Sequence, residues 1–167
     1  MTNCRPPREA DVPALAEIRN DLATQYALLA SPRPNTLDDV RAWIGRRTAD
    51  PAALFHVVAD ETDAAVGFTQ VVGIDDENRH GAFGIAIDRR HRGRGHGRAA
   101  LEHAFAAARA DGRLDKLVLQ VAADNERALA LYRAAGFREV GVHRRHYRAP
   151  DGWHDVAVME CFLVAQP

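Results

Sequence analysis

Apolar and polar residues alternate with a period of two in several short stretches of the chain, and such stretches predict β-strands. They lie at residues 3–6, 55–59, 66–72, 81–87, 115–122, 137–143 and 155–163. The last two are expected to pair as an antiparallel hairpin. Residues 144–154, which contain Pro150-Asp151-Gly152, are expected to form its turn.

Apolar residues three or four apart predict four helices. The first begins at Asp11, with a proline just inside, and runs to about Leu22. The others are expected at residues 36–47, at 99–110, and between an N-cap at 124 or 125 and Gly136. Residues 23–35, which contain Ser31-Pro32-Arg33-Pro34-Asn35, are expected to be an irregular loop.

Strands and helices intermixed along 167 residues predict one α/β (α+β) domain that covers residues 1–167. Hydrophobic residues make up 47% and charged residues 27%, which is typical of a soluble globular protein. No apolar run is long enough to span a bilayer, and the N-terminus has no apolar signal segment. With only Cys4 and Cys161 present, a cytoplasmic protein with free thiols and no membrane partner is expected.

The segment Arg89–Arg98 carries five arginines, two histidines and no acid between a predicted strand and a predicted helix. Glycines at 93, 95 and 97 allow positive φ and a close approach to the main chain. A helix N-terminus adds unpaired N–H groups and the positive end of a dipole. These features predict a cradle for the phosphates of a ligand.

Three other phosphate-binding classes fit poorly. A Walker loop ends in Gly-Lys-Ser/Thr, whereas Gly97 is followed by Arg98-Ala99. The dinucleotide fingerprint needs Gly-x-Gly-x-x-Gly early in a βαβ unit. A nucleic-acid-binding module is disfavoured because the net charge is −1, so one small polyanion is the expected ligand.

A second motif runs from Asn125 to Phe137, Asn-x-x-Ala-x-x-Leu-Tyr-x-x-x-Gly-Phe. Asn125 and Tyr132 are seven residues apart and therefore share one face of a helix, two turns apart. With Arg-x-x-Gly-x-Gly at 92–97, and a strand, a helix and another strand in this order, the chain resembles the GNAT superfamily of acyl-CoA N-acyltransferases. The segment Tyr147–Met159 resembles the subgroup that acetylates ribosomal-protein N-termini, spermidine or free amino acids.

The resemblance implies a mixed, mostly antiparallel sheet of six or seven strands. A central parallel pair, here 83–87 and 117–122, splays apart, and about four helices flank the sheet. It also implies acetyl-CoA as co-substrate. No metal is expected, because a metal site needs three or four ligands and only His143 and His146 are close in sequence. The expected contacts of acetyl-CoA are Ile85, Ala86, Ile87, Arg92, Gly93, Arg94, Gly95, His96, Gly97, Arg98, Asn125 and Tyr132. Tyr132 is expected to be catalytic, as the donor that protonates the departing thiolate.

The general base is the weakest part of the resemblance. The family commonly places a glutamate in the first splayed strand, and this chain has Ala82 there. Glu77 and His80, at the start of that strand, are the candidate base or substrate-binding residues. A reaction without a base is also open, because proximity alone can supply about 7–11 kcal/mol.

The expected function is transfer of an acetyl group from acetyl-CoA to a primary amine by direct attack in a ternary complex. The acceptor is a small molecule or a protein N-terminus, and the sequence does not identify it. A non-catalytic acyl-CoA-binding or sensor domain is the alternative, because the strand glutamate is missing. A homodimer is possible from the resemblance, and nucleic acid is not an expected partner.

Overall fold

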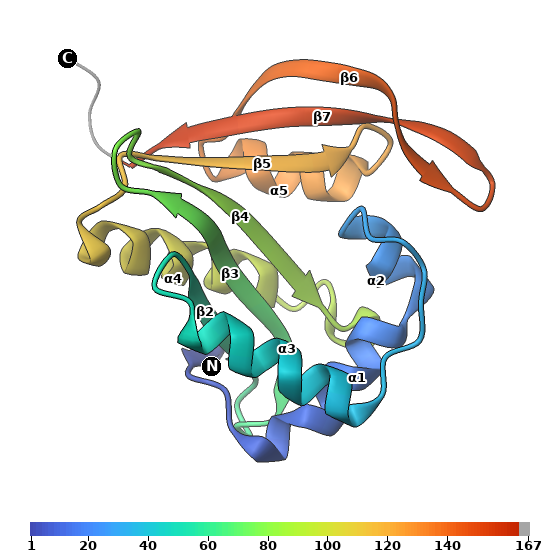
Figure 1. Cartoon of the computed structure of the whole chain (residues 1–167), viewed down its shortest axis with the longest axis vertical. Coiled ribbons are helices and arrows are strands. Elements are labelled where there is room, and N and C mark those ends of the chain that lie inside the picture. The colour runs from blue at the N-terminus through green and yellow to red at the C-terminus, as the bar shows by residue number, and fades with distance from the viewer. Residues whose placement is uncertain (164–167) are drawn as a thin grey trace.

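The structure is a computed structural model that describes residues 1–163, and its seven strands form one sheet in the order β1-β2-β3-β4-β5-β7-β6 (Figure 1). The strands are β1 (Asn3–Arg5), β2 (Leu54–Ala59), β3 (Ala65–Asp75), β4 (His80–Ile87), β5 (Lys116–Ala122), β6 (Arg138–Ala149) and β7 (Gly152–Phe162). Neighbouring strands are antiparallel except for the central pair β4–β5. The expected mixed sheet is confirmed.

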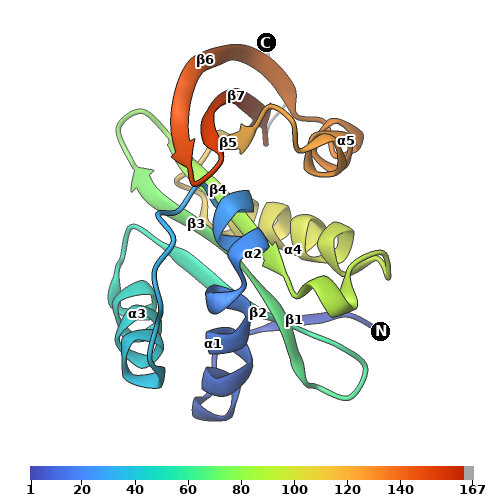
Figure 2. The same ribbon diagram turned by 90° about the vertical axis from the view of Figure 1, so that its right-hand side faces the viewer.

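Helices cover both faces of this sheet (Figure 2). They are α1 (Val12–Asn20), α2 (Leu22–Ala27), α3 (Leu37–Ala49), α4 (His96–Asp111) and α5 (Glu126–Ala134). On one face, Leu15 of α1 and Trp43 of α3 pack against Phe68. On the other, Leu101 of α4 packs in a second apolar cluster that also contains Phe83. The central strands are therefore buried on both sides, as their apolar residues require.

The helix α2 was not expected, and the prediction of an irregular segment over 23–35 is wrong for its first five residues. Asp21 caps this helix, because its carboxylate accepts a hydrogen bond from the Thr24 N–H at 2.9 Å. Thr24 and Gln25 are buried although they are polar. Helical periodicity of apolar residues was therefore absent, and the chain has five α-helices within residues 1–163 instead of four.

The expected turn over 144–154 is also too long. The strands β6 and β7 continue through most of it, and only Pro150 and Asp151 lie between them. Their register shifts between His143 and Tyr147, where Arg145 has φ of 49° and donates its N–H to Asp155. Most side chains of β6 are exposed, so alternation of apolar residues did not mark the strand.

Two helix starts differ in detail from the sequence-based expectation. Asp11 does precede α1, but its carboxylate binds the buried Arg5 guanidinium at 2.8 and 2.9 Å instead of capping the helix. The helix α4 begins at His96, three residues earlier than expected, with Gly95 as its N-cap. Consequently, the glycine loop runs directly into the first turn of this helix.

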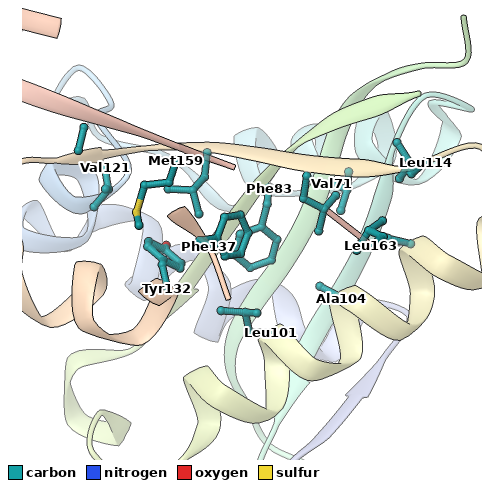
Figure 3. Packing of buried hydrophobic residues seen from close by; sticks show 14 of the residues in the cluster. Val71, Phe83, Leu101, Ala104, Leu114, Val121, Tyr132, Phe137, Met159 and Leu163 are labelled. Atoms are coloured by element: carbon teal, nitrogen blue, oxygen red, sulfur yellow. The ribbon is translucent and has the colours of Figure 1, made fainter. Parts of the chain in front are cut away.

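The two parallel strands separate after three residue pairs. Only His80, Gly81 and Ala82 of β4 pair with β5. Beyond them β4 stays paired with β3 and β5 with β7, and the two strands diverge (Figure 1). Phe83, Tyr132 and Phe137 point toward one another below this divergence (Figure 3), with ring centroids 5.7–6.2 Å apart. The facing edges of both strands thus carry backbone groups with no strand partner.

Candidate active site

A cavity of about 290 Å³ lies where β4 and β5 diverge. Its wall is made by α2, the end of β4, the glycine loop with the start of α4, and one face of α5. The lining residues are Thr24, Ala27, Leu28, Ile85, Ala86, Ile87, His91, Arg92, Gly93, Gly95, Gly97, Arg98, Asn125, Arg127, Ala128, Leu131 and Tyr132. None of them is acidic. Ten of the twelve residues expected to contact acetyl-CoA are among them, and Arg94 and His96 are not.

The glycine loop has the backbone geometry of an anion cradle. Gly93 has φ of 81° and Gly95 has φ of 88°, a region that side-chain-bearing residues rarely adopt. No side chain caps α4, and its first intrahelical acceptor bond joins the Ala99 N–H to the Gly95 carbonyl. The preceding N–H groups therefore remain free to bind phosphate oxygens at the positive end of the helix. A Cβ on Gly97 would lie 3.4 Å from the end of the Leu131 side chain, so α4 and α5 pack closely at this position.

Arg92 and His96 of the glycine loop use polar atoms of their side chains for hydrogen bonds within the fold. The Arg92 guanidinium donates to the Ile87 carbonyl at 2.8 Å and to the Thr24 hydroxyl at 3.1 Å. It ties the loop to the end of β4 and to α2. His96 is buried, and its Nδ1 lies 2.9 Å from the Thr2 hydroxyl.

Positive charge surrounds the mouth of the cavity. Arg94 is exposed, and Arg98 forms an ion pair at 3.0 Å with Glu102, one turn along α4. Arg127 lines the cavity from the opposite helix, α5. Guanidinium groups bind phosphate with two parallel hydrogen bonds, so the mouth is suited to a polyphosphate.

Asn125 closes the end of β5 and begins α5. Its side-chain oxygen accepts a hydrogen bond from the Ala128 N–H at 3.2 Å, and its N–H donates to the Ala122 carbonyl at 2.9 Å. The expected N-cap is thereby assigned to Asn125. This cap orients α5 so that Ala128 and Tyr132 face the cavity.

Tyr132 projects from α5 into the apolar cluster shown in Figure 3 and lines the cavity. Burial raises the pKa of its phenol to about 12, because the charged phenolate is poorly solvated there. The surroundings therefore hold the hydroxyl protonated. They also make it a weaker acid than the thiol whose reference pKa is about 8.5.

Glu77 and His80 do not reach the cavity. His80 is the first residue of β4 and pairs with Lys116, and Glu77 lies in the exposed turn before it. The cavity begins at Ile85, five residues or roughly 17 Å further along the extended strand. Neither residue lines this cavity, and their role as base or substrate-binding residue stays a prediction.

A hydrogen-bonded cluster joins α2 to the β6–β7 hairpin. The Tyr26 hydroxyl donates to the Asp124 carboxylate at 2.8 Å and lies 3.0 Å from His154 Nδ1. The other ring nitrogen of His154 lies 2.9 Å from Asp151. Hydrogen bonding to Asp151 and Asp124 raises the pKa of His154 above its usual value. The hairpin is thus anchored over the helix that forms one wall of the cavity.

Sequence reasoning missed seven lining residues, namely Thr24, Ala27, Leu28, His91, Arg127, Ala128 and Leu131. Ala128 could have been found, because it is three residues from Asn125 on the same helical face. The α2 residues could not, because no local pattern marked that helix. Within residues 1–163, no group of three or more His, Cys, Asp or Glu side chains is arranged to hold a metal ion.

A search for helices that could cross a membrane found none among residues 1–163. Cys4 and Cys161 form no disulfide, and burial raises the pKa of both thiols. Neither cysteine lines the cavity. The polar groups of the cavity are therefore backbone amides, arginines, a threonine, a histidine, an asparagine and a tyrosine.

Comparison with known proteins agrees with this geometry. Residues 3–138 match the family model of the acetyltransferase (GNAT) domain. The chain is 36% identical over 105 residues to the [ribosomal protein bS18]-alanine N-acetyltransferase of Escherichia coli K12, covering 63% of this chain and 68% of that protein. It is 34% identical over 111 residues to the mycothiol acetyltransferase of Beutenbergia cavernae, of which it spans only 37%.

Solved structures show the same fold. The spermidine N-acetyltransferase from Vibrio cholerae, in complex with CoA and spermine, superposes with a TM-score of 0.89 at 23% identity, covering 97% of this chain and 95% of that one. An N-acetyltransferase from Staphylococcus aureus Mu50 gives 0.86 at 23% identity, with 98% and 99% covered. The splayed strands, the glycine cradle and the family match together show that this chain belongs to the GNAT family of N-acetyltransferases.

Proposed function

We propose that this protein transfers an acetyl group from acetyl-CoA to the primary amine of a small molecule or a protein N-terminus. The observation that carries the proposal is the single cavity wall that holds a phosphate cradle, an unpaired strand edge and a buried tyrosine hydroxyl. These three features match the three parts of the donor, which are the pyrophosphate, the amide-containing pantetheine arm and the thioester.

The cofactor follows the cavity from its mouth inward. The N–H groups of residues 93–98 bind the pyrophosphate, and Arg94, Arg98 and Arg127 add charge at the mouth. The pantetheine amides pair with the open edge of β4 at Ile85 and Ile87, as an added strand would. Ala86, Asn125 and Ala128 confine this arm, and His96 contributes its backbone N–H.

The chemistry is a direct displacement. The neutral amine nitrogen attacks the thioester carbonyl carbon, and the tetrahedral intermediate expels the thiolate of CoA as the C–S bond breaks. Tyr132 donates a hydrogen bond to the departing sulfur, which lowers the cost of the developing charge. The proton released by the amine leaves to solvent, and the thiolate is reprotonated. No lining residue is acidic, so no carboxylate of the cavity acts as the base.

Two measurements test this function. Titration calorimetry with acetyl-CoA is expected to show binding that Gly95→Val weakens strongly, because the new side chain would obstruct the phosphates. A thiol-release assay over a library of primary amines, with mass detection of products, is expected to show steady turnover with at least one of them. Failure to bind acetyl-CoA at millimolar concentration would refute the proposal.

A non-catalytic acyl-CoA sensor is the second candidate, and Ala82 is the observation that favours it. A sensor would bind acetyl-CoA but release no thiol with any amine, so the same library separates the two. The cytoplasmic location, the single domain over residues 1–167 and the homodimer remain predictions.

A further inference from the structure

A second cavity, of about 320 Å³, lies beside the first and has a different chemical character. It is enclosed by the end of α1, by α2 and by the segment that leads to α3. The lining residues are Arg19, Gln25, Leu28, Ala30, Ser31, Arg33 and Asn35. Leu28 lines both cavities, so one side chain separates this space from the proposed acetyl-CoA site.

The walls of this cavity are fixed by hydrogen bonds of its two amide side chains, and the Asn35 side-chain oxygen also accepts a bond of 3.3 Å from a terminal nitrogen of Arg19. The Gln25 amide donates to the carbonyls of Arg19 and Arg33, both at 2.7 Å, and accepts from the Arg33 N–H. The Asn20 side chain donates to the Asn35 carbonyl at 2.9 Å and accepts from the Asn35 N–H at 2.7 Å, and the Asn35 side-chain amide donates to the Arg33 carbonyl at 3.2 Å. Both amide side chains are therefore committed to shaping the space, and the charge within it comes from Arg19 and Arg33.

The Arg19 guanidinium is held in one plane but has an unsatisfied nitrogen. Its Cζ lies 4.2 Å from the centroid of the Trp43 ring, so it stacks on the indole. Its Nε is buried and has no hydrogen-bond partner among the described residues. A buried donor without a partner is costly and normally indicates a missing acceptor.

Positive charge predominates around Arg19. Burial and the nearby Arg33, Arg47 and Arg46 lower the pKa of Arg19, and only the carboxylate of Asp39 opposes them. Across residues 1–163, none of these four arginines has a carboxylate within 4.0 Å, although ion pairs occupy many of the other arginines. Two lining guanidinium groups with no carboxylate within 4.0 Å, and with Arg46 and Arg47 nearby, form a site that prefers an anion.

We propose that this second cavity binds a carboxylate of the amine acceptor through Arg19 and Arg33, so that acidic amines are the preferred substrates. This inference rests on the proposed function, because it identifies the acceptor of the same reaction. The acceptor would hold its carboxylate on one side of Leu28 and present its amine toward the thioester. The planar, stacked guanidinium of Arg19 suits the two oxygens of a carboxylate.

Direct binding tests the site without relying on turnover. Succinate is titrated by calorimetry into the protein saturated with CoA, and binding is expected. Arg33→Gln and Arg19→Gln should each weaken it at least about tenfold, the usual effect of losing a charge-assisted hydrogen bond. Arg46→Gln is the matched control: it removes a charge of the same group but not a lining residue, and should change the constant less than about threefold.

Arg33 lies on an exposed segment, so its variant keeps the test decisive if loss of the Arg19–Trp43 stack unfolds the protein. Each variant is accepted only if it binds CoA with unchanged affinity. Absent succinate binding, or equal binding by Arg33→Gln and the unmodified protein, would overturn the site.

Turnover then identifies the source of the carboxylate. Peptides with a free N-terminus and one Glu are compared with their Gln counterparts, and two amino acids with their amides. The acidic member of at least one pair should have a KM for the amine about tenfold lower than that of its neutral counterpart. Arg33→Gln should abolish this difference. Succinate should inhibit the unmodified protein by competing with the amine. Succinate that binds without competing would refute the acceptor assignment and leave an independent anion site. Turnover with no preference for acidic amines would refute it while the proposed acetyl transfer stands.

Discussion

Replacing Tyr132 by phenylalanine separates its chemical role from its packing role. The ring packs against Phe83 and Phe137, and these contacts survive the change. The hydroxyl has no hydrogen-bond partner within residues 1–163, so its removal breaks no bond of the fold. We expect the free energy of unfolding at neutral pH to change by less than about 0.5 kcal/mol. Acetyl-CoA affinity should likewise stay nearly constant.

The expected loss of activity follows from the pKa of the phenol. With a pKa of about 12, Tyr132 is a weaker acid than the departing thiol, whose reference pKa is about 8.5. Complete proton transfer would therefore be uphill by about 5 kcal/mol, which favours a hydrogen bond to the sulfur over full protonation. Loss of one such donor typically costs about 100-fold in kcat. We expect a loss of this size in Tyr132→Phe, with the KM for acetyl-CoA unchanged.

The assay is steady-state thiol release with the best amine of the library, next to calorimetry with CoA. A second readout is unfolding as a function of pH. Because burial raises the folded-state pKa of Tyr132, its stabilising contribution is complete below pH 10 and is lost as pH rises to about 12. The unmodified protein should therefore lose about 3 kcal/mol more than Tyr132→Phe across that window. Unimpaired turnover by the variant would refute the catalytic role, whereas an unchanged alkaline stability profile would refute the burial argument.

Three further outcomes are expected. In Gly95→Ala the new Cβ meets nothing within 4 Å but must adopt φ of 88°, so we expect a loss of about 1 kcal/mol in stability by thermal unfolding, and weaker acetyl-CoA binding by calorimetry. Asp11→Asn removes the bidentate partner of the buried Arg5, which keeps its ion pair with Asp63, so chemical denaturation should show a loss of about 2 kcal/mol. Burial alone would raise the pKa of Asp11, but hydrogen bonds from Arg5 lower it, so the stabilising effect of this pair in the unmodified protein should disappear as pH falls below about 4. In a ¹H–¹⁵N NMR titration His154 should titrate above 6.5, and Asp151→Asn should shift it down; an unshifted value would contradict the hydrogen bond between them.

The core of the candidate site could be predicted because its signals are local. Glycine at 93 and 95 is itself the signal for positive φ, and asparagine at 125 is itself the signal for a helix N-cap. The position of Tyr132 on the same face of the helix then follows from its spacing of seven residues from Asn125. Each of these properties depends on a few adjacent residues. The splay of the strands came from the family resemblance, because no local pattern of β4 or β5 specifies where their pairing ends.

The parts that sequence reasoning missed depend on contacts between distant segments. The helix α2 buries Gln25, whose amide bonds the backbone of Arg19 and Arg33 in two other segments. A buried polar residue of this kind breaks the apolar periodicity of a helix, so the sequence pattern predicts a loop at its position. The second cavity could not be predicted from the sequence for the same reason. Its charge comes from Arg19 and Arg33, which lie 14 residues apart and meet only after α1, α2 and the following segment have packed.

The reaction cavity is lined by no carboxylate that could accept the proton of the amine, and this constrains which amines can react. Where no carboxylate takes up its proton, the amine reacts in the form that is already neutral in solution. At pH 7 a peptide α-amine with a pKa of about 7.7 is about 17% neutral, whereas an alkylamine with a pKa of about 10.4 is about 0.04% neutral. The difference of roughly 400-fold acts on the attack step before any binding preference. The polar side chains of the cavity are Thr24, His91, Asn125, Tyr132 and three arginines. Since none of them is a carboxylate, the cavity should favour α-amines over polyamines. Arg19 and Arg33 of the second cavity also favour α-amines of acidic peptides over polyamines, because their charge attracts carboxylates and repels polycations.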